Sequence, residues 1–448
     1  MATYLGKTFS SAGNQRTWTW SGWVKFTGGG SDETIFSGGT GSGASGNRVV
    51  FQTLSGEEEK VMVFSGNTSP FAFKTSASLR DKSAWYHFVL AMDTTQATDS
   101  NRFKMYINGS QVTNTAQLTY PAQNLDLGLN NNQQQYIGLK TIDNNNPFNG
   151  YLADVYFIDG TQLTATSFGE TDSTTGIWKP KTYSGSYGSN GYKLEFKNAG
   201  ALGTDTSGNS NTWTVSNAGT GAQVIDTPTN NFCTMNPLAN KYPNSTFTLG
   251  NLAVAMGASQ STFNAGTFGV SSGKWYFEMK PTAMGSGTDN CLVGVVSRSD
   301  STGTSDYLGE PTSVIYRNNG NYKKDSGNAT YGASWSTSDI VMVAVDCDNN
   351  NIYFGTNGQW ADGSGNNDEA SPNSAIAFTS TMIADGVVFP AFGDLSTNSP
   401  EPAGQFNFGN PPFSISSGNA DANGYGNFEY AVPSGYYALC TENLNTYG

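Results

Sequence analysis

The stretch FNGYLADVYFIDG, residues 148–160, is apolar on both faces when it is read as a strand. Alternate side chains of a strand point to opposite faces. One face would carry Tyr151, Ala153, Val155 and Phe157, and the other Leu152, Tyr156 and Ile158. The carboxylate of Asp154 interrupts the second face. Because double-sided apolar strands lie inside packed β-structure, this stretch predicts a sheet that is covered on both sides.

The composition favours an all-β protein. The chain has 448 residues, a length typical of two or three domains. Charged residues make up 13%, about half of the usual share of roughly 25%. Aromatic residues also make up 13%, and glycine occurs 54 times. Aromatic residues favour strands and a buried core, whereas glycine favours turns.

The charge argues against two classes of partner. The formal net charge is -13 at pH 7, and Lys323–Lys324 is the only pair of adjacent basic residues. Phosphate backbones and anionic membranes bind dense basic patches. We therefore expect no nucleic-acid partner and no membrane insertion. The longest apolar stretches, such as residues 340–345, are also too short to cross a bilayer.

The N-terminal residues and the cysteines indicate a protein made in a reducing cytosol. Residues 1–20 lack the charged start and apolar run of a secretory signal. The four cysteines show no CxxC spacing. Cys347 continues the alternation of Val343 and Val345, so we interpret it as a small buried hydrophobe.

Other segments alternate as strands and end in tight turns. In TWTWSGWVKF, residues 17–26, the polar side chains all share one face, which predicts a half-buried strand. Asn108-Gly109 follows an alternating segment and predicts a type I′ hairpin. Similar Asn-Gly or Asp-Gly pairs begin at positions 108, 149, 159, 190, 319, 357, 362, 385 and 423. No helical period extends beyond a turn or two.

Three regions differ in character. Residues 1–165 hold a first set of strands, and residues 241–448 hold a second set with a C-terminal extension. Residues 166–240 place short strand-like segments between long polar runs, and we predict a bridging region that lies against a neighbouring domain. The predicted fold class is all-β, with two jelly-roll-like β-sandwiches joined by a β-rich bridging region.

Several stretches resemble known families. In the first region WTWSGWVKF, WYHFVLAMD, NRFKMYINGSQV, YIGLK and FNGYLADVYFIDG resemble the laminin-G/concanavalin A-like jelly roll, over about residues 1–165. Further on, GKWYFEMKP, VGVVSR, DIVMVAVDCDNNNIYFGTNGQ, VFPAFGDL and FNFG resemble a SPRY domain, over about residues 245–415. GYLADVYFIDGTQLTATSFGETDSTTGIWKPK (150–181) and DTPTNNFCTMNPL (226–238) resemble a combination common in structural proteins of marine tailed bacteriophages.

These resemblances imply a role for Asp154, a location and a set of partners. Laminin-G-like domains carry a carboxylate at the position of Asp154, which implies a structural acid that is hydrogen-bonded to loop backbone or partly solvated, with a calcium ligand as the alternative. The phage resemblance implies a virion protein, made in the host bacterial cytoplasm, that works by binding and assembly without catalysis. Other virion proteins, a host surface glycan or protein, and further copies of the chain are the expected partners. No cofactor is expected.

Two glycine motifs do not indicate catalysis. Gly41, Gly43 and Gly46 fit GxGxxG, but a strand-like segment follows where a nucleotide site needs a helix N-terminus. Residues 269–273 fit the nucleophile motif GxSxG, and they also run into a strand. The only histidine, His87, lies in the other region, in a strand where we expect a packed or edge side chain.

The alternative class is a carbohydrate-active enzyme, because concanavalin A-like folds include glucanases. Glycoside hydrolysis needs two carboxylates at a fixed separation. The resembling glucanases carry them as ExDxxE on one strand. The nearest approach here contains Glu170 and Asp172, ends in Thr175 and lies in the bridging region. We interpret the acidic run at 57–59 as a solvated edge.

The sequence does not indicate a metal site. DCDNNN, residues 346–351, imitates the start of a calcium loop, but Asn351 and Asn357 stand where that loop needs Gly and Glu. We predict a hairpin tip there, and a weak calcium site elsewhere in the first domain stays an open alternative. One histidine and four unclustered cysteines disfavour zinc.

Glycan binding requires an exposed aromatic ring beside amide and carboxylate groups. Trp360, Tyr307 and Tyr322 lie in sequences of this kind and are the ligand-binding candidates, with packing on neighbours as the alternative for each. No catalytic residue is predicted. A short tail appendage or fibre and a capsid decoration or knob are both open as virion roles. The early first strand and the lack of heptads favour these over a long fibre.

Overall fold

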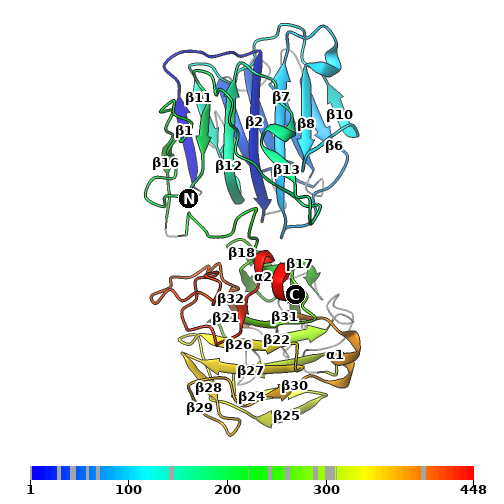
Figure 1. Cartoon of the computed structure of the whole chain (residues 1–448), viewed down its shortest axis with the longest axis vertical. Coiled ribbons are helices and arrows are strands. Elements are labelled where there is room, and N and C mark those ends of the chain that lie inside the picture. The colour runs from blue at the N-terminus through cyan, green and yellow to red at the C-terminus, as the bar shows by residue number, and fades with distance from the viewer. Residues whose placement is uncertain are drawn as a thin grey trace. The chain divides into compact units, whose positions relative to one another are not determined.

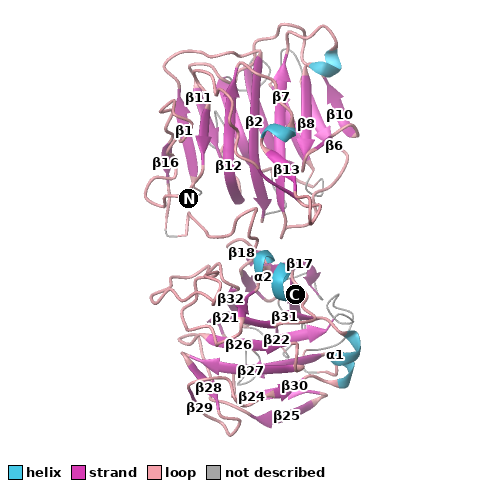
Figure 2. Ribbon diagram, in the orientation of Figure 1, coloured by secondary structure: helices cyan, strands magenta, loops and turns pink. Residues whose placement is uncertain are grey.

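The chain forms two compact units, Met1–Thr229 and Asn230–Gly448, in a computed structural model that is nearly all β (Figures 1 and 2). The structure describes residues 3–27, 32–40, 47–56, 60–66, 71–140, 146–219, 221–240, 245–257, 263–285, 291–297, 308, 310–394 and 400–448. Of the region expected to form a bridge, residues 166–229 belong to the first unit and residues 230–240 to the second.

The first unit contains two large antiparallel sheets and one short hairpin. The eight-stranded sheet has the order β10 (Thr115–Thr119), β6 (Ala72–Thr75), β5 (Val61–Ser65), β4 (Asn47–Thr53), β3 (Thr34–Thr40), β11 (Gln134–Ile137), β1 (Tyr4–Thr8) and β16 (Thr214–Ser216). The six-stranded sheet has the order β15 (Tyr192–Leu194), β12 (Gly150–Asp159), β2 (Thr17–Phe26), β7 (Trp85–Asp93), β8 (Phe103–Ile107) and β9 (Ser110–Gln111). The hairpin pairs β13 (Gly169–Thr171) with β14 (Trp178–Pro180). The short 3₁₀ helices are η2 (Asp99–Asn101) and η3 (Ala165–Ser167).

The core of the first unit lies between its two large sheets. Its aromatic members stack edge to face or in parallel, and they come from both sheets: Trp18, Trp20, Phe26, Phe36, Phe51, Phe88 and Phe157. Strands rich in aromatic residues on one face produce this packing, because each ring removes a large apolar area from water. The sandwich expected from the alternating segments is therefore confirmed.

Residues 161–190, the covering segment, lie on the outer face of the six-stranded sheet. The apolar cluster there contains Val89, Ala91, Tyr106, Tyr156, Ile158, Ala165 and Phe168, with Leu163, Trp178, Tyr183 and Tyr187 packed against it. This second layer explains why β7 and β12 are apolar on both faces. The prediction of a half-buried β2 is wrong, because Thr19, Ser21 and Lys25 are 0% exposed beneath segments that follow β12 in the sequence.

A β-bulge at Asp154 accounts for the carboxylate within β12. Asp154 and Val155 together lie opposite the single residue Gly22, between the pairs that Ala153 and Tyr156 make with β2. Asp154 has φ 46, in the left-handed region that Asp tolerates better than most residues. Among the described residues no group donates a hydrogen bond to its carboxylate, so the expected bond to loop backbone is not found. The half-buried side chain fits the partly solvated alternative.

The bulge also moves the side chains of β12 from one face to the other. Leu152 packs on the core before the bulge, and Val155 and Phe157 pack on it afterwards. The expectation that Tyr151 and Ala153 share a face with Val155 is therefore wrong. Side chains alternate between the two faces of a strand. One extra residue therefore places the side chains before the bulge on the face opposite to the one that simple alternation predicts.

Replacing Asp154 by valine is expected to lower the free energy of unfolding of the first unit by about 1–2 kcal/mol, because a β-branched residue is strained at positive φ. Asp154→Gly should stay within about 0.5 kcal/mol of the wild type, because glycine adopts this conformation without strain. Denaturant unfolding of the two variants measures the difference. Equal stability of the valine and glycine variants would mean that residue 154 does not carry the bulge.

Two of the Asn-Gly pairs form the hairpins that the sequence predicts. Asn108 and Gly109 have φ 47 and 83 between β8 and β9. Asn357 and Gly358 have φ 53 and 85 in the second unit. Positive φ at both central residues is the signature of the type I′ turn, and Asn-Gly reaches it at little cost.

The second unit is also built from two large sheets. Its seven-stranded sheet has the order β17 (Met235–Asn240), β20 (Phe263–Gly266), β31 (Val388–Gly393), β22 (Leu292–Ser297), β23 (Ser313–Arg317), β24 (Asn321–Lys324) and β25 (Gly327–Thr330). The ten-stranded sheet has the order β18 (Thr246–Thr248), β19 (Ala253–Ala255), β32 (Ala403–Asn407), β21 (Lys274–Ala283), β26 (Val341–Asp346), β27 (Asn351–Thr356), β28 (Gln359–Ala361) and β29 (Asn367–Glu369). Of its further strands, β30 (Ile376–Ala377) pairs with β27 and β33 (Tyr437–Ala438) with β21. Two short helices are α1 (Ser380–Asp385) and α2 (Thr441–Tyr447).

The ten-stranded sheet is buried on both faces as well. Trp275, Phe277 and Met279 of β21 face the core between the sheets, as their alternation predicts. Tyr276 lies on the other face with residues of the C-terminal segment, among them Phe428. All four cysteines are free and buried. Within the described ranges no helix has the length and apolar character needed to cross a bilayer.

Candidate functional site

The outer face of the six-stranded sheet holds three polar clusters, and the first contains the chain's one histidine. The Nε2 atom of His87 in β7 lies 2.8 Å from the Oγ atom of Ser21 in β2, and both side chains are buried. A hydroxyl within hydrogen-bond reach of an imidazole is the first requirement for an activated nucleophile. Whether His87 can activate the Ser21 hydroxyl depends on which of its two ring nitrogens carries the proton.

A tryptophan fixes the tautomer of His87. The Nε1 atom of Trp178 lies 3.1 Å from His87 Nδ1, and an indole N–H can only donate. Nδ1 is therefore the acceptor, and the proton of the neutral ring is on Nε2. His87 donates to Ser21 and cannot remove the proton of its hydroxyl. A Cβ atom on Gly109 would lie 2.8 Å from the Trp178 ring, so the hairpin turn needs glycine there.

Burial keeps the His87 ring neutral. It lowers the pKa of His87 from 6.5 to about 3. The ring also stacks on Trp23 with a centroid distance of 4.9 Å. The expectation of a packed histidine is confirmed, and this cluster is a structural support between β2, β7 and the covering segment.

The second cluster is a buried ion pair between Lys25 and Asp226. The Nζ atom of Lys25 lies 2.6 Å from Asp226 Oδ2, and the side chains are 0% and 1% exposed. Trp85 Nε1 donates to Asp226 Oδ1 at 2.7 Å. In the strand register Lys25 lies between Trp85 and Tyr151. Burial, and secondly the charge of Asp226, raise the pKa of Tyr151.

The third cluster brings together two carboxylates that the sequence analysis did not connect. Asp154 and Glu195 lie at the β12–β15 pairing, where Val155 pairs with Leu194. Burial raises the pKa of Asp154, and the charge of Glu195 raises it further. Glu195 accepts from Lys193 at 2.6 Å, which is the main cause of its lowered pKa. The residues are 41 positions apart, so no local motif could have indicated the pair.

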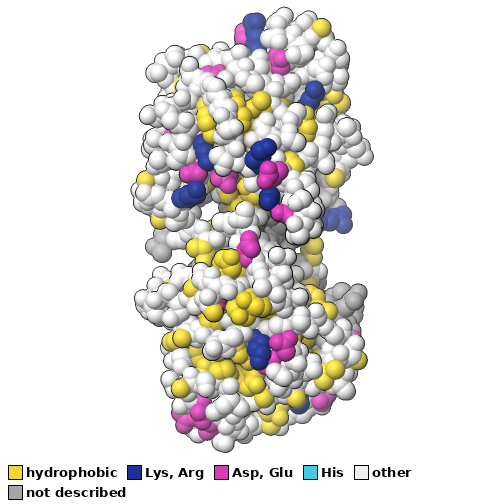
Figure 3. Space-filling model, in the orientation of Figure 1, with side chains coloured by type: hydrophobic (Ala, Val, Ile, Leu, Met, Phe, Trp, Pro, Cys, Tyr) yellow, Lys and Arg dark blue, Asp and Glu magenta, His cyan; other side chains and the backbone are white. Residues whose placement is uncertain are grey.

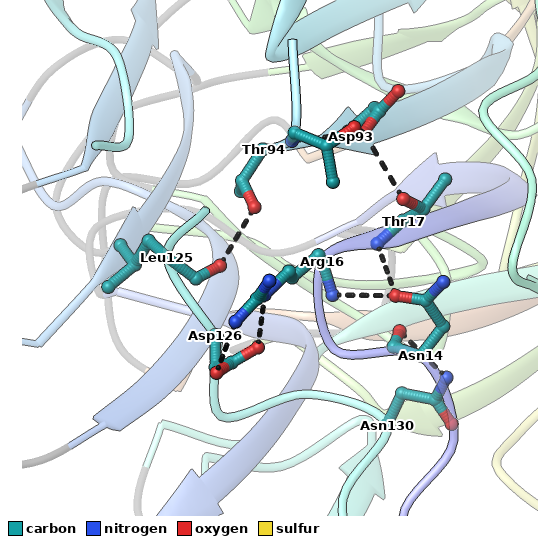
Figure 4. A network of polar contacts seen from close by, with 9 residues as sticks. Asn14, Arg16, Thr17, Asp93, Thr94, Leu125, Asp126 and Asn130 are labelled. Atoms are coloured by element: carbon teal, nitrogen blue, oxygen red, sulfur yellow. Dashed lines mark hydrogen bonds and ion pairs between the residues drawn. The ribbon is translucent and has the colours of Figure 1, made fainter. Parts of the chain in front are cut away.

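The loops at one end of the first sandwich are closed by hydrogen bonds within the chain (Figure 4). Asn14 Oδ1 accepts from the backbone N–H groups of Arg16 and Thr17 at 3.0 and 2.9 Å. Arg16 forms an exposed pair with Asp126 at 2.7 Å. Asp93 accepts from Thr17 at 3.2 Å. These carboxylates already have donors, so the network is a structural closure of the loops.

The described residues contain no group of three His, Cys, Asp or Glu side chains placed to hold a metal ion. The calcium-like stretch forms the turn between β26 and β27, as predicted. Asp346 accepts from Lys274 at 2.8 Å and from Asn349 at 2.9 Å. Asp348 accepts from the backbone of Gly273 at 2.8 Å. Both carboxylates therefore stabilise the turn.

Glu170 and Asp172, the carboxylates nearest to a glycosidase pattern in the sequence, both lie close to Lys179. Lys179 Nζ lies 2.9 Å from Asp172 and 3.9 Å from Glu170, across the β13–β14 hairpin. The hydrogen bond from Lys179 is the main cause of the lowered pKa of Asp172. A glycosidase acid needs a raised pKa, and that of Asp172 is shifted in the opposite direction. The acidic run 57–59 and the loop 41–46 lie outside the described residues.

The three glycan candidates have different environments. Trp360 is 3% exposed and packs edge to face on Tyr276 at 6.3 Å. The expectation of an exposed ring at Trp360 is wrong, because the C-terminal segment covers this face of the sheet. Tyr322 is half-buried against Tyr331 at 6.0 Å. Tyr307 falls in a stretch that the structure does not describe.

The visible surface of each unit carries few charges (Figure 3). On this face the charged side chains are scattered, and patches of apolar side chains lie between areas of backbone and other side chains. Six large apolar side chains are exposed among the described residues, and the two most exposed are Ile177 at 65% and Leu238 at 67%. Leu238 belongs to the edge strand β17, and Ile177 lies in the turn between β13 and β14.

The fold and these clusters define a two-domain all-β protein made of two β-sandwiches. Residues 6–167 match the family model of the concanavalin A-like lectin/glucanases superfamily, and residues 274–411 match that of the SPRY domain. The chain therefore contains a concanavalin A-like domain followed by a SPRY domain, as the resemblances imply.

Solved structures show weak similarity to part of this chain. The SPRY domain of human HERC1 is 18% identical with a TM-score of 0.31, and the match covers 38% of this chain and 96% of that one. A heptameric SAP-like pentraxin from Limulus polyphemus is 16% identical with a TM-score of 0.27, covering 36% and 72%. Stonustoxin is 16% identical with a TM-score of 0.29, covering 39% and 27%. Among curated proteins no match was found.

Proposed function

We propose that this protein is a non-enzymatic virion surface protein of a tailed phage. It acts by assembly with other virion proteins and with copies of itself, and by recognition of a host surface glycan or protein. Its position is either a short tail appendage or a decoration of the capsid. Its two sandwich domains present neutral, hydroxyl- and amide-rich loops, a composition suited to recognition through hydrogen bonds.

One observation carries this proposal. The stretches 150–181 and 226–238 resemble phage structural proteins, and they contain Ile177 and Leu238, the two most exposed large apolar side chains of the described residues. Single exposed apolar side chains are common on protein surfaces, so the support comes from their position within these two stretches. Contact with another virion protein would remove both from water and stabilise the assembly.

Substitution of the exposed side chains tests the assembly role. Phage complemented with Ile177→Ser or Leu238→Ser should incorporate about tenfold fewer copies per virion, because each buried isoleucine or leucine contributes about 1.5–3 kcal/mol. Quantitative mass spectrometry of purified virions measures the copy number. Ile383→Ser, at a position that is 50% exposed outside both stretches, is the matched control and should leave it unchanged.

Gold labelling of virions with an antibody against the chain tests the location. Gold at the tail supports host recognition, and gold on the head supports a decoration. If the chain is absent from purified virions and no gold binds intact or opened particles, the virion proposal fails.

A second candidate function is a carbohydrate-active enzyme. The β12–β15 pairing, which brings Asp154 and Glu195 together, supports it, because the pKa of Asp154 is raised and that of Glu195 is lowered, as in an acid–base pair. Release of reducing sugar from host polysaccharide by the wild type, and its loss in both Asp154→Asn and Glu195→Gln, would support the enzyme. No release would remove this candidate.

A further inference from the structure

Lys25 and Asp226 meet where water does not reach them. Their contact distance is 2.6 Å, and neither side chain is more than 1% exposed. By comparison, the Lys193–Glu195 and Lys274–Asp346 pairs each have a partner that is more than a tenth exposed. An amine and a carboxyl group that are held in contact without water are placed to condense, because condensation replaces two poorly hydrated charges by one neutral amide.

We propose that Lys25 and Asp226 form an intramolecular amide bond. The proton moves from Lys25 Nζ to Asp226 Oδ2, and the lone pair of Nζ then attacks the carboxyl carbon. The C–Oδ2 bond breaks, and Oδ2 leaves as water with two of the three original ammonium protons. The third proton stays on the amide nitrogen. The reaction is a condensation, so no oxidant, reductant or cofactor is required.

The surrounding residues hold the reacting groups in this geometry. Trp85 donates to Oδ1 at 2.7 Å, which leaves Oδ2 facing the lysine. The same N–H group stabilises the negative charge that develops on Oδ1 during attack. Lys25 is fixed between Trp85 and Tyr151 on three neighbouring strands. Rigid positioning of this kind replaces a bimolecular encounter and raises the effective concentration of the amine.

The bond would join two points that are 201 residues apart in the sequence. It would attach the last segment of the first unit to β2, close to the centre of the six-stranded sheet. Almost the whole unit would then lie within one covalent loop, which restricts the unfolded chain. Such a bond is independent of redox conditions, unlike a disulfide, and the four cysteines form none.

The mass of the full-length purified chain tests the proposal. The intact mass should be lower than the sequence mass by one water molecule. A tryptic digest should contain a branched peptide that joins the segments around Lys25 and Asp226, with no cleavage after Lys25. Peptide mapping is essential because Asp-Gly steps such as Asp159-Gly160 can also lose water by cyclisation.

Three variants test which side chains take part in forming the amide bond. Lys25→Arg should abolish the branched peptide, because a guanidinium stays protonated and is a poor nucleophile. Trp85→Phe keeps both reacting groups and should slow formation by about a hundredfold, as expected for loss of one oxyanion donor. Lys274→Arg changes the comparable but partly exposed Lys274–Asp346 pair and should leave the branched peptide unchanged. A wild-type chain of full mass, or a water loss that maps only to an Asp-Gly step, would overturn the proposal.

Discussion

Replacement of Asp226 by alanine is expected to lower the free energy of unfolding of the first unit by about 3–5 kcal/mol. The variant leaves the Lys25 ammonium buried without its carboxylate and removes the acceptor of Trp85 Nε1. A buried charge that loses its partner cannot recover its hydration unless the sandwich opens. The effect is expected whether the two groups form an ion pair or an amide, because alanine removes both arrangements.

Hydrogen exchange of peptides from β2 and β7 measures this loss in the first unit separately from the second. The double variant Lys25→Met/Asp226→Leu should be more stable than either single change, because it leaves no buried charge. Lys274→Met, at a pair whose lysine is 33% exposed, should cost less than about 1 kcal/mol. A loss of similar size in Asp226→Ala and Lys274→Met would contradict the role assigned to the buried pair.

Acidification is expected to destabilise the first unit through His87. Its pKa is about 3 in the folded chain and 6.5 in the unfolded chain, so the unfolded state binds the extra proton between these values. The stability that the neutral ring contributes is therefore present above the unfolded pKa and lost as the pH falls. Between about pH 7.5 and about pH 5 the loss should be about 2 kcal/mol, at roughly 1.4 kcal/mol per pH unit.

The variant His87→Gln provides the control for this pH dependence. A glutamine side chain can accept from Trp178 and donate to Ser21, and it does not titrate. The effect of Asp154 on the pH dependence of stability has the opposite sign. Its pKa is raised in the folded chain, so its contribution to stability is lost as the pH rises. The difference between wild type and variant cancels this contribution. Equal pH dependence of the two proteins would show that His87 does not titrate on unfolding.

Local sequence was sufficient to predict several strands and two of the hairpin turns. The alternation of Trp275, Phe277 and Met279 predicted a core-facing strand, and Asn108-Gly109 predicted a hairpin. Both signals depend on neighbouring residues alone, through the period of a strand and the φ values that Asn and Gly adopt. The double-sided stretch at 148–160 likewise indicated that a second layer had to exist.

The candidate sites could be predicted less well, because their partners are distant in the sequence. Trp360 lies in a loop-like sequence, but residues near the C-terminus bury it. Asp154 and Glu195 meet only because β15 pairs with β12. No local pattern connects such residues, since the pairing of strands is decided by the packing of the whole sandwich.

The sequence by itself determined which segments are strands, where several of them turn, and that the chain is all-β. The tertiary structure alone decided what covers the outer faces and which side chains meet there. Lys25 reads as a solvated residue on the polar face of an alternating strand, yet it is buried against Asp226. The physical reason is that the period of a strand separates its two faces, whereas the solvent exposure of each face depends on segments that fold back from elsewhere in the chain.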